Sequence, residues 1–177
     1  PSTVKQFRDL PVLLVGFPWR QRYHFLFAFH EKDVPLRMAK LAPFHLAIPV
    51  SDLATAKDFY ENILGCIPGR SSDHWADYNF FGHQLVLHED KDHKGLKHFN
   101  EVDGKAVPVP HFGVVLEWEV FQNFSQQLID QNIEFQIAPY LRFEGQPGEQ
   151  LTMFFYDPSG NALEFKSFKH IDQLFAT

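Results

Sequence analysis

The chain has 177 residues, of which 45% are hydrophobic and 21% are charged, as in an ordinary globular protein with room for a core. Its formal net charge of −6 argues against a general phosphate-binding surface, so we expect no nucleic-acid partner. Cys66 is the only cysteine, which excludes an intramolecular disulfide and a thiolate metal cluster. No run of 18 or more apolar residues occurs, so we expect no membrane-spanning helix and a cytoplasmic location.

Residues 1–37 differ in charge from the rest of the chain. They hold six Lys or Arg against three Asp or Glu, a net +3, which leaves −9 on residues 38–177. A targeting peptide is one interpretation, but Pro11 and Pro18 interrupt the apolar stretch and no small-residue cleavage site follows. We favour an added arm that packs on the domain or on a partner subunit.

The remaining chain repeats one order of predicted elements, a strand, a helix and then two or three strands. In the first half, alternation predicts strands over 44–50, 75–81 and 83–88, a helix over 53–64 and a loop over 68–72. In the second half, we predict strands over 111–117, 134–143, 151–156 and 162–168, a helix over 118–132 and a helical tail over 171–175. The polar stretch between the two halves is predicted to be a linker. The expected divisions are an N-terminal extension (1–37), a first module (38–90), a linker loop (91–109) and a second module with a short C-terminal tail (110–177).

The last two strands flank a tight turn, Asp157 to Asn161, in which Pro158 and Gly160 set the backbone. Glu164 follows as the one acidic side chain inside an otherwise apolar, alternating strand. An ionised carboxylate in such a place is costly unless a positive group meets it. Glu164 is therefore a candidate ligand for a cation.

Each module opens with a strand that carries a histidine, His45 in the first and His111 in the second. On each strand the residues next to the histidine are apolar, and a small residue stands two places on, which leaves room above the sheet. Two imidazoles and one carboxylate form the facial triad that suits Fe(II) and leaves positions open for substrate and O2. The same set also suits Zn, Mn, Ni or Co, so the metal's identity does not follow from the residues.

Three further residues are candidates for a catalytic or binding role. Gln84 and His88 share one face of their strand, on either side of Val86. Arg142 precedes a Gly-containing loop and could clamp a substrate carboxylate, although an ordinary solvated arginine is the alternative.

Residues 43–168 resemble the vicinal oxygen chelate superfamily, the group of glyoxalases, bleomycin-resistance proteins and extradiol dioxygenases. The matching motifs are Phe44-His45-Leu46-Ala47-Ile48-Pro49-Val50 with Asp52-Leu53, Phe59-Tyr60, Leu64-Gly65, His111-Phe112-Gly113, and Asp157-Pro158-Ser159-Gly160-Asn161 with Glu164. Within the group the chain looks most like predicted extradiol-type dioxygenases, which share 81–84 and 145–149. It departs from the extradiol pattern at Phe154, where a tyrosine is usual, and at 145–147, where a histidine is usual.

The resemblance implies an α+β fold in which two βαβββ modules form a curved mixed sheet, a cup with the metal held inside by His45, His111 and Glu164. It also implies an extradiol-like dioxygenase that acts on a small aromatic or vicinal-oxygen substrate with Fe(II), and a homodimer. One alternative is a glyoxalase-like lyase or isomerase with a redox-inert metal. Others are a metal-free protein that binds a small ligand and a purely structural protein.

Overall fold

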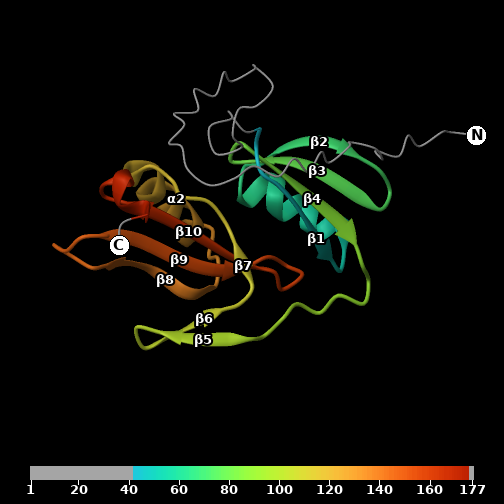
Figure 1. Ribbon diagram of the computed structural model, residues 1–177. Coiled ribbons are helices and arrows are strands. Elements are labelled where there is room, and N and C mark those ends of the chain that lie inside the picture. Colours follow the sequence, from blue (N-terminus) through green and yellow to red (C-terminus); the bar gives the residue numbers. More distant parts are fainter. Residues whose placement is uncertain (1–41, 176–177) are drawn as a thin grey trace, which may run out of the picture. The chain divides into compact units, whose positions relative to one another are not determined.

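The computed structural model describes residues 42–175 (Figure 1). The N-terminal extension, and the arm expected there, lie outside these described residues. Within them, no helix is both long and apolar enough to cross a membrane.

The first module is one four-stranded sheet with a helix. Its elements are β1 (His45–Val50), α1 (Leu53–Asp58), the π-helical turn η2 (Phe59–Ile63), β2 (Ile67–Ser71), β3 (Trp75–Phe80) and β4 (His83–Glu89). The strand order is β1-β4-β3-β2, with β1 parallel to β4. Helix α1 begins at Asp52, whose carboxylate accepts a hydrogen bond from the Thr55 N–H at 2.7 Å.

The prediction of a loop over 68–72 is wrong, because β2 occupies most of this segment. Pro68 is tolerated there because β2 is the edge strand of its sheet, where a missing N–H leaves no ladder bond unmade. The pairing with β3 shifts in register between Pro68 and Ser71, an irregularity that the Pro-Gly sequence permits.

The second module repeats this plan. Its elements are β7 (His111–Phe112), α2 (Trp118–Asp130), β8 (Phe135–Arg142), β9 (Gln150–Tyr156), β10 (Ala162–Phe168) and the 3-10 helix η3 (Ile171–Phe175). The strand order β7-β10-β9-β8 matches that of the first module. Two βαβββ modules are thereby confirmed, and each carries its own sheet in the described part of the chain.

Strand β7 is shorter than the predicted 111–117 because the backbone at Gly113 passes very close to β10. A Cβ on Gly113 would stand 1.6 Å from the carbonyl oxygen of Glu164, so only glycine fits there. Beyond it the chain still follows β10, since the Leu116 N–H donates to the Lys166 carbonyl at 2.7 Å.

The segment expected to be a linker loop contains a hairpin. Strands β5 (Phe99–Val102) and β6 (Lys105–Pro108) pair only with each other in the described chain. Asp103 and Gly104 form the tip, with φ of 50° and 70° respectively, the left-handed pair of a tight hairpin turn. In Figure 1 the hairpin lies next to β8, which it contacts through Asp103 and Lys105.

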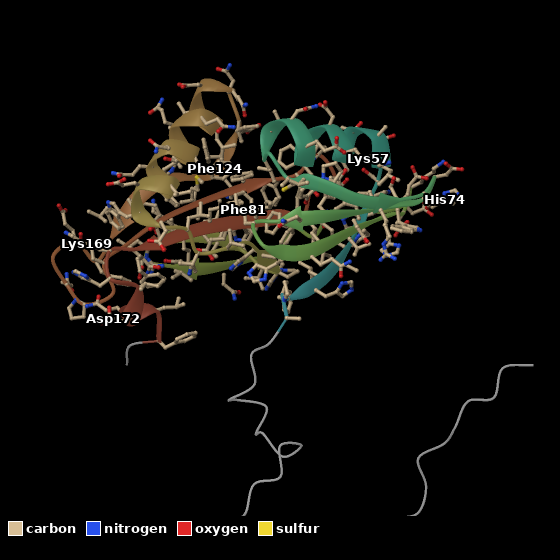
Figure 2. The ribbon with its side chains drawn as sticks, turned by 90° about the horizontal axis from the view of Figure 1, so that it is seen from above. Lys57, His74, Phe81, Phe124, Lys169 and Asp172 are labelled. Carbon is tan, nitrogen blue, oxygen red and sulfur yellow. The ribbon has the colours of Figure 1, made fainter. Side chains whose placement is uncertain are left out.

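The two modules share one aromatic core. Phe155 and Phe165 stack in it with ring centroids 5.7 Å apart, and Phe59, the first residue of η2, lies 6.4 Å from Phe155. Phe81, from the turn between β3 and β4, contacts Phe124 of α2 at 5.7 Å, and Figure 2 shows the two rings where the modules meet. The apolar faces of both modules therefore pack together, and the opposite faces carry the polar side chains.

The turn after β9 joins the modules through polar contacts. The buried Asp157 carboxylate accepts hydrogen bonds from the N–H groups of Ser159 and Asn161, and from the Tyr60 hydroxyl of the first module at 3.1 Å. The Asn161 amide donates to the carbonyl of Pro49 in β1 at 2.9 Å. Burial raises the pKa of Asp157, and these hydrogen bonds act against that rise.

Candidate functional site

The second module brings two of the predicted metal ligands into contact. His111 in β7 lies opposite Ala162 in β10, so Glu164, two residues further on, projects from the same face. The Nε2 atom of His111 is 3.0 Å from Oε2 of Glu164, whose side chain is only 9% exposed. The two side chains are therefore in direct contact.

The imidazole of His111 is oriented by its other nitrogen. Nδ1 lies 2.6 Å from the carbonyl oxygen of Pro108, which can only accept, so Nδ1 carries a proton and Nε2 faces Glu164. The hydrogen bond to Glu164 raises the pKa of His111, although burial acts in the opposite direction. The contact of Nδ1 with a carbonyl is common in metal-binding histidines, but Nε2 here donates to Glu164 and would have to lose that proton to bind a metal.

Glu164 is held ionised by three neighbours. Thr152 donates its hydroxyl to Oε1 at 2.9 Å, and the Lys166 ammonium lies 3.2 Å from the same oxygen. Burial alone would raise the pKa of Glu164, but His111, Lys166 and Thr152 together hold it below its ordinary value. Thr152 and Lys166 were not predicted, although strand alternation places both on the face of Glu164.

The first module prepares His45 in a different way. Its Nδ1 lies 2.7 Å from Oε1 of Gln84, and the Gln84 amide nitrogen lies 3.3 Å from a carboxylate oxygen of Asp77. Since Asp77 can only accept, the amide oxygen of Gln84 must face His45, and Nδ1 of His45 must be the donor. His45 is exposed, and its Nε2 points away from the nitrogen that Gln84 orients. Asp77 was missed by the sequence reasoning.

The structure does not bring the three predicted ligands together. Across residues 42–175, no group of three or more His, Cys, Asp or Glu side chains is placed to hold a metal ion. The reason is the shared core, because Leu46 of β1 and Leu163 of β10 both point into it. His45 and Glu164 alternate with these residues and so project from the outer faces of two different sheets.

The other candidates have distinct surroundings. His88 is exposed on β4, in register with Pro49 and Trp75 rather than with His45. The side chain of Arg142 is 16% exposed and forms an ion pair with Asp103 at the hairpin tip. The donor set at His111 and Glu164 fits a divalent metal, since it offers one oriented imidazole and one ionised carboxylate that three groups already orient.

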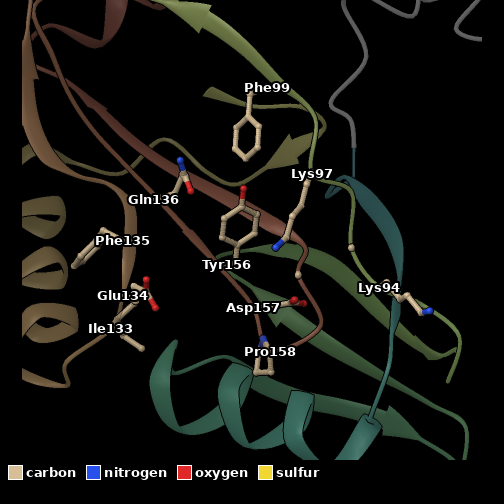
Figure 3. Close-up of a pocket in the computed structure, with 12 residues that line it drawn as sticks. Lys94, Lys97, Phe99, Ile133, Glu134, Phe135, Gln136, Tyr156, Asp157 and Pro158 are labelled. Atoms are coloured by element: carbon tan, nitrogen blue, oxygen red, sulfur yellow. The ribbon is translucent and has the colours of Figure 1, made fainter. Parts of the chain in front are cut away.

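The second module borders two cavities, and His111 lines one of them. A cavity of about 260 Å³ is lined by His111 and by the apolar side chains of Leu46, Ile48 and Phe112. A second, of about 510 Å³, lies between the linker and the ends of β8 and β9 (Figure 3), where Phe99, Lys97 and Tyr156 surround it. The Tyr156 hydroxyl is buried and has no hydrogen-bond partner among the described residues.

Residues 42–165 match the family model of the Glyoxalase/Bleomycin resistance protein/Dioxygenase superfamily. Among solved structures, a glyoxalase/bleomycin resistance protein/dioxygenase from Alicyclobacillus acidocaldarius is 35% identical, with a TM-score of 0.61 over 75% of this chain and 96% of that one. No curated protein sequence matches the chain.

More distant structures share the fold. A fosfomycin resistance protein from Listeria monocytogenes is 16% identical with a TM-score of 0.56, over 73% of this chain and 95% of that one. A glyoxalase/dioxygenase from Nostoc punctiforme is 18% identical with a TM-score of 0.55, over 75% of this chain and 98% of that one. At these identities the similarity concerns the fold alone.

Proposed function

The chain belongs to the glyoxalase/bleomycin resistance protein/dioxygenase superfamily, and on this premise we propose that it is a metal-dependent enzyme acting on a small molecule with adjacent oxygen atoms. The observation that carries the proposal is the contact of His111 with Glu164, in which both groups are already oriented and the carboxylate is ionised. A divalent metal held there would supply Lewis-acid chemistry to two neighbouring substrate oxygens and, if it is Fe(II), the capacity to activate O2.

The third ligand, in this proposal, is His45 of a second copy of the chain. His45 has a free Nε2 and a fixed orientation, yet it lies on the other module's outer face. A twofold dimer that sets the first module of one copy against the second module of the other would bring His45 to His111 and Glu164 twice. In this proposal the site has all three ligands only in the homodimer.

The surrounding side chains have defined parts in this site. Lys166 and Thr152 keep Glu164 ionised and pointed at His111. Gln84, expected to assist catalysis, instead positions His45 through the hydrogen bonds that join it to His45 and Asp77. Tyr156, with its unpartnered hydroxyl on the face of the site, is placed to bind a substrate oxygen.

Extradiol-type ring cleavage is the first reaction to test, because two histidines and one carboxylate are the ligand set of non-haem Fe(II) oxygenases. Phe154 contacts the His111 ring with centroids 5.2 Å apart, where the extradiol pattern has a tyrosine, so proton transfer would need another group. Exposed His88 is the candidate in the first module. Isomerisation or lyase chemistry with a redox-inert metal is the second reaction to test.

Metal content of anaerobically purified protein tests the proposal. We expect about one metal per chain in the wild type, and loss of that metal in His111→Ala and in His45→Ala, since each removes one ligand of three. His74→Ala is the matched control, because the His74 side chain is 82% exposed and distant from the pair in the fold. It should keep the wild-type metal content.

Iron in this measurement would direct the next assay to oxygen uptake with catechols, and Zn, Ni, Mn or Co would direct it to isomerase and lyase substrates. Stoichiometric metal in His111→Ala would refute the site. Absence of metal after each ion has been added back would leave a metal-free binding protein, which the apolar cavity beside His111 supports. Ligand affinity that survives chelation would identify that second function.

A further inference from the structure

Arg142 lies on the same face of the sheet as Glu164, and only part of its guanidinium has hydrogen-bond partners among the described residues. Its position opposite Gln150 places it two side-chain rows along β9 from Phe154, the residue that lies opposite Glu164. At about 3.4 Å per residue, the four residue steps from Gln150 to Phe154 span roughly 14 Å at the backbone. The guanidinium lies over the Phe143 ring at 4.8 Å, which holds it in one plane.

Two buried polar atoms beside this guanidinium lack partners. The Nε of Arg142 is a donor without an acceptor, and the Oε1 of Gln150 is an acceptor without a donor, among the residues that the structure describes. Buried polar groups normally have a partner. The two atoms belong to cross-strand neighbours on β8 and β9. A carboxylate can accept a hydrogen bond from Nε of Arg142, whereas Oε1 of Gln150 needs a donor.

The terminal nitrogen of Arg142 is already paired with the carboxylate of Asp103. Asp103 stands at the tip of the β5–β6 hairpin. The ammonium of Lys105, the first residue of β6, lies 4.4 Å from the centroid of the Tyr140 ring. Tyr140 and Arg142 share one face of β8. The hairpin is thus fastened to the sheet by side chains alone, with no ladder hydrogen bond to β8 in the described chain.

We propose that Arg142 forms a subsite for a carboxylate group of the substrate, and that Asp103 occupies this subsite until the substrate displaces the hairpin tip. The substrate class is therefore a small organic acid, with its carboxylate at the end of the site remote from the metal ligands. This inference rests on the proposed function for the identity of the site, but it is tested without the metal.

A substrate carboxylate can form more hydrogen bonds with Arg142 than Asp103 does, which favours displacement of Asp103. Asp103 uses one nitrogen of Arg142 and leaves Nε unpaired, whereas a free carboxylate can accept from Nε and a terminal nitrogen together. Such a two-bond pair is the stronger and more specific arrangement for arginine and carboxylate. The Asp103 side chain is 54% exposed, so it leaves the subsite into water at little cost.

Benzoate and its neutral counterpart benzamide are suitable probes, and calorimetric titration of chelated full-length protein measures their binding. We expect Asp103→Ala to bind benzoate at least about tenfold more tightly than the wild type, because the internal competitor has gone. Benzamide affinity should not change. Arg142→Gln, in the Asp103→Ala background, should abolish the preference for benzoate over benzamide.

Glu101→Ala is the matched control, since Glu101 is an exposed carboxylate on the same hairpin and its removal changes the net charge equally. Equal gains in Asp103→Ala and Glu101→Ala would reduce the effect to net charge and overturn the subsite. Absence of benzoate binding in Asp103→Ala would overturn it as well. Benzoate binding that follows Asp103 and Arg142 in a protein that takes up no metal would keep the subsite and refute the proposed enzyme function.

Discussion

Mixing two defective variants tests whether the metal site is shared between two copies of the chain. His45→Ala keeps the pair of His111 with Glu164, and His111→Ala keeps His45 with its Gln84 partner. If the ligands come from different copies, each variant alone has no complete site. A mixed dimer has one complete site, made from the intact half of each copy.

The size of the rescue follows from the symmetry. After subunit exchange, equal amounts of the variants give about half mixed dimers, each with one of its two sites intact, so metal content should reach about a quarter of the wild-type value. Both variants should fold. His45 is exposed and loses one side-chain hydrogen bond, worth about 1 kcal/mol, and His111 loses two contacts, worth about 1–3 kcal/mol, against a typical total of roughly 5–15 kcal/mol.

The assay is metal per chain after the variants have been mixed under mild denaturant, dialysed and loaded with one equivalent of metal. Unmixed variants treated identically provide the background, and circular dichroism confirms that each is folded. If mixing restores nothing while both variants are folded dimers, the reasoning from separate half-sites is refuted. Wild-type metal content in His45→Ala alone would equally remove His45 from the site.

Three further outcomes follow from the same contacts. In chelated protein, the His111–Glu164 pair should stabilise the fold most at pH values between the lowered pKa of Glu164 and the raised pKa of His111. This stabilisation should be lost as pH falls through the pKa of Glu164 and as pH rises through the pKa of His111. Urea denaturation of the wild type and of His111→Gln across pH measures it as the difference in unfolding free energy. Gln84→Leu should weaken metal affinity about 10–100-fold by releasing the orientation of His45, with little change in thermal stability, and competitive metal titration would show no change if Gln84 were an ordinary surface residue. Gly113→Ala should destabilise the protein by about 3 kcal/mol or more, because its Cβ meets the backbone of Glu164, and a wild-type melting temperature would contradict that geometry.

The elements that the sequence predicts well are those set by local periodicity. Strands β9 and β10 and the turn between them follow from apolar alternation around Pro158 and Gly160, and the histidine face of β1 follows from the same rule. The parallel pairing of β7 with β10 sets His111 opposite Ala162, so that alternation places Glu164 on the same face as His111.

The rest depends on contacts between distant segments. The strands of the β5–β6 hairpin have only four residues each, and the hairpin contacts β8 through Asp103 and Lys105, whose partners lie more than thirty residues away in the sequence. The separation of His45 from the other ligands follows from the way the two sheets pack, which alternation within one strand cannot reveal. Sequence patterns therefore indicated His45, His111 and Glu164 as candidate ligands, but not which of them the fold brings into contact.

The turn from Asp157 to Asn161 has a consequence for the integrity of the protein. Its carboxylate and amide hold Tyr60 and Pro49 of the first module, and the aromatic core continues the same contact. A protease cut in the exposed stretch near Lys94 would therefore leave two fragments that stay associated and melt together. Co-expressed halves, divided at that point, would reassemble as a split protein, with Glu164 still aligned by a turn that the other fragment clamps.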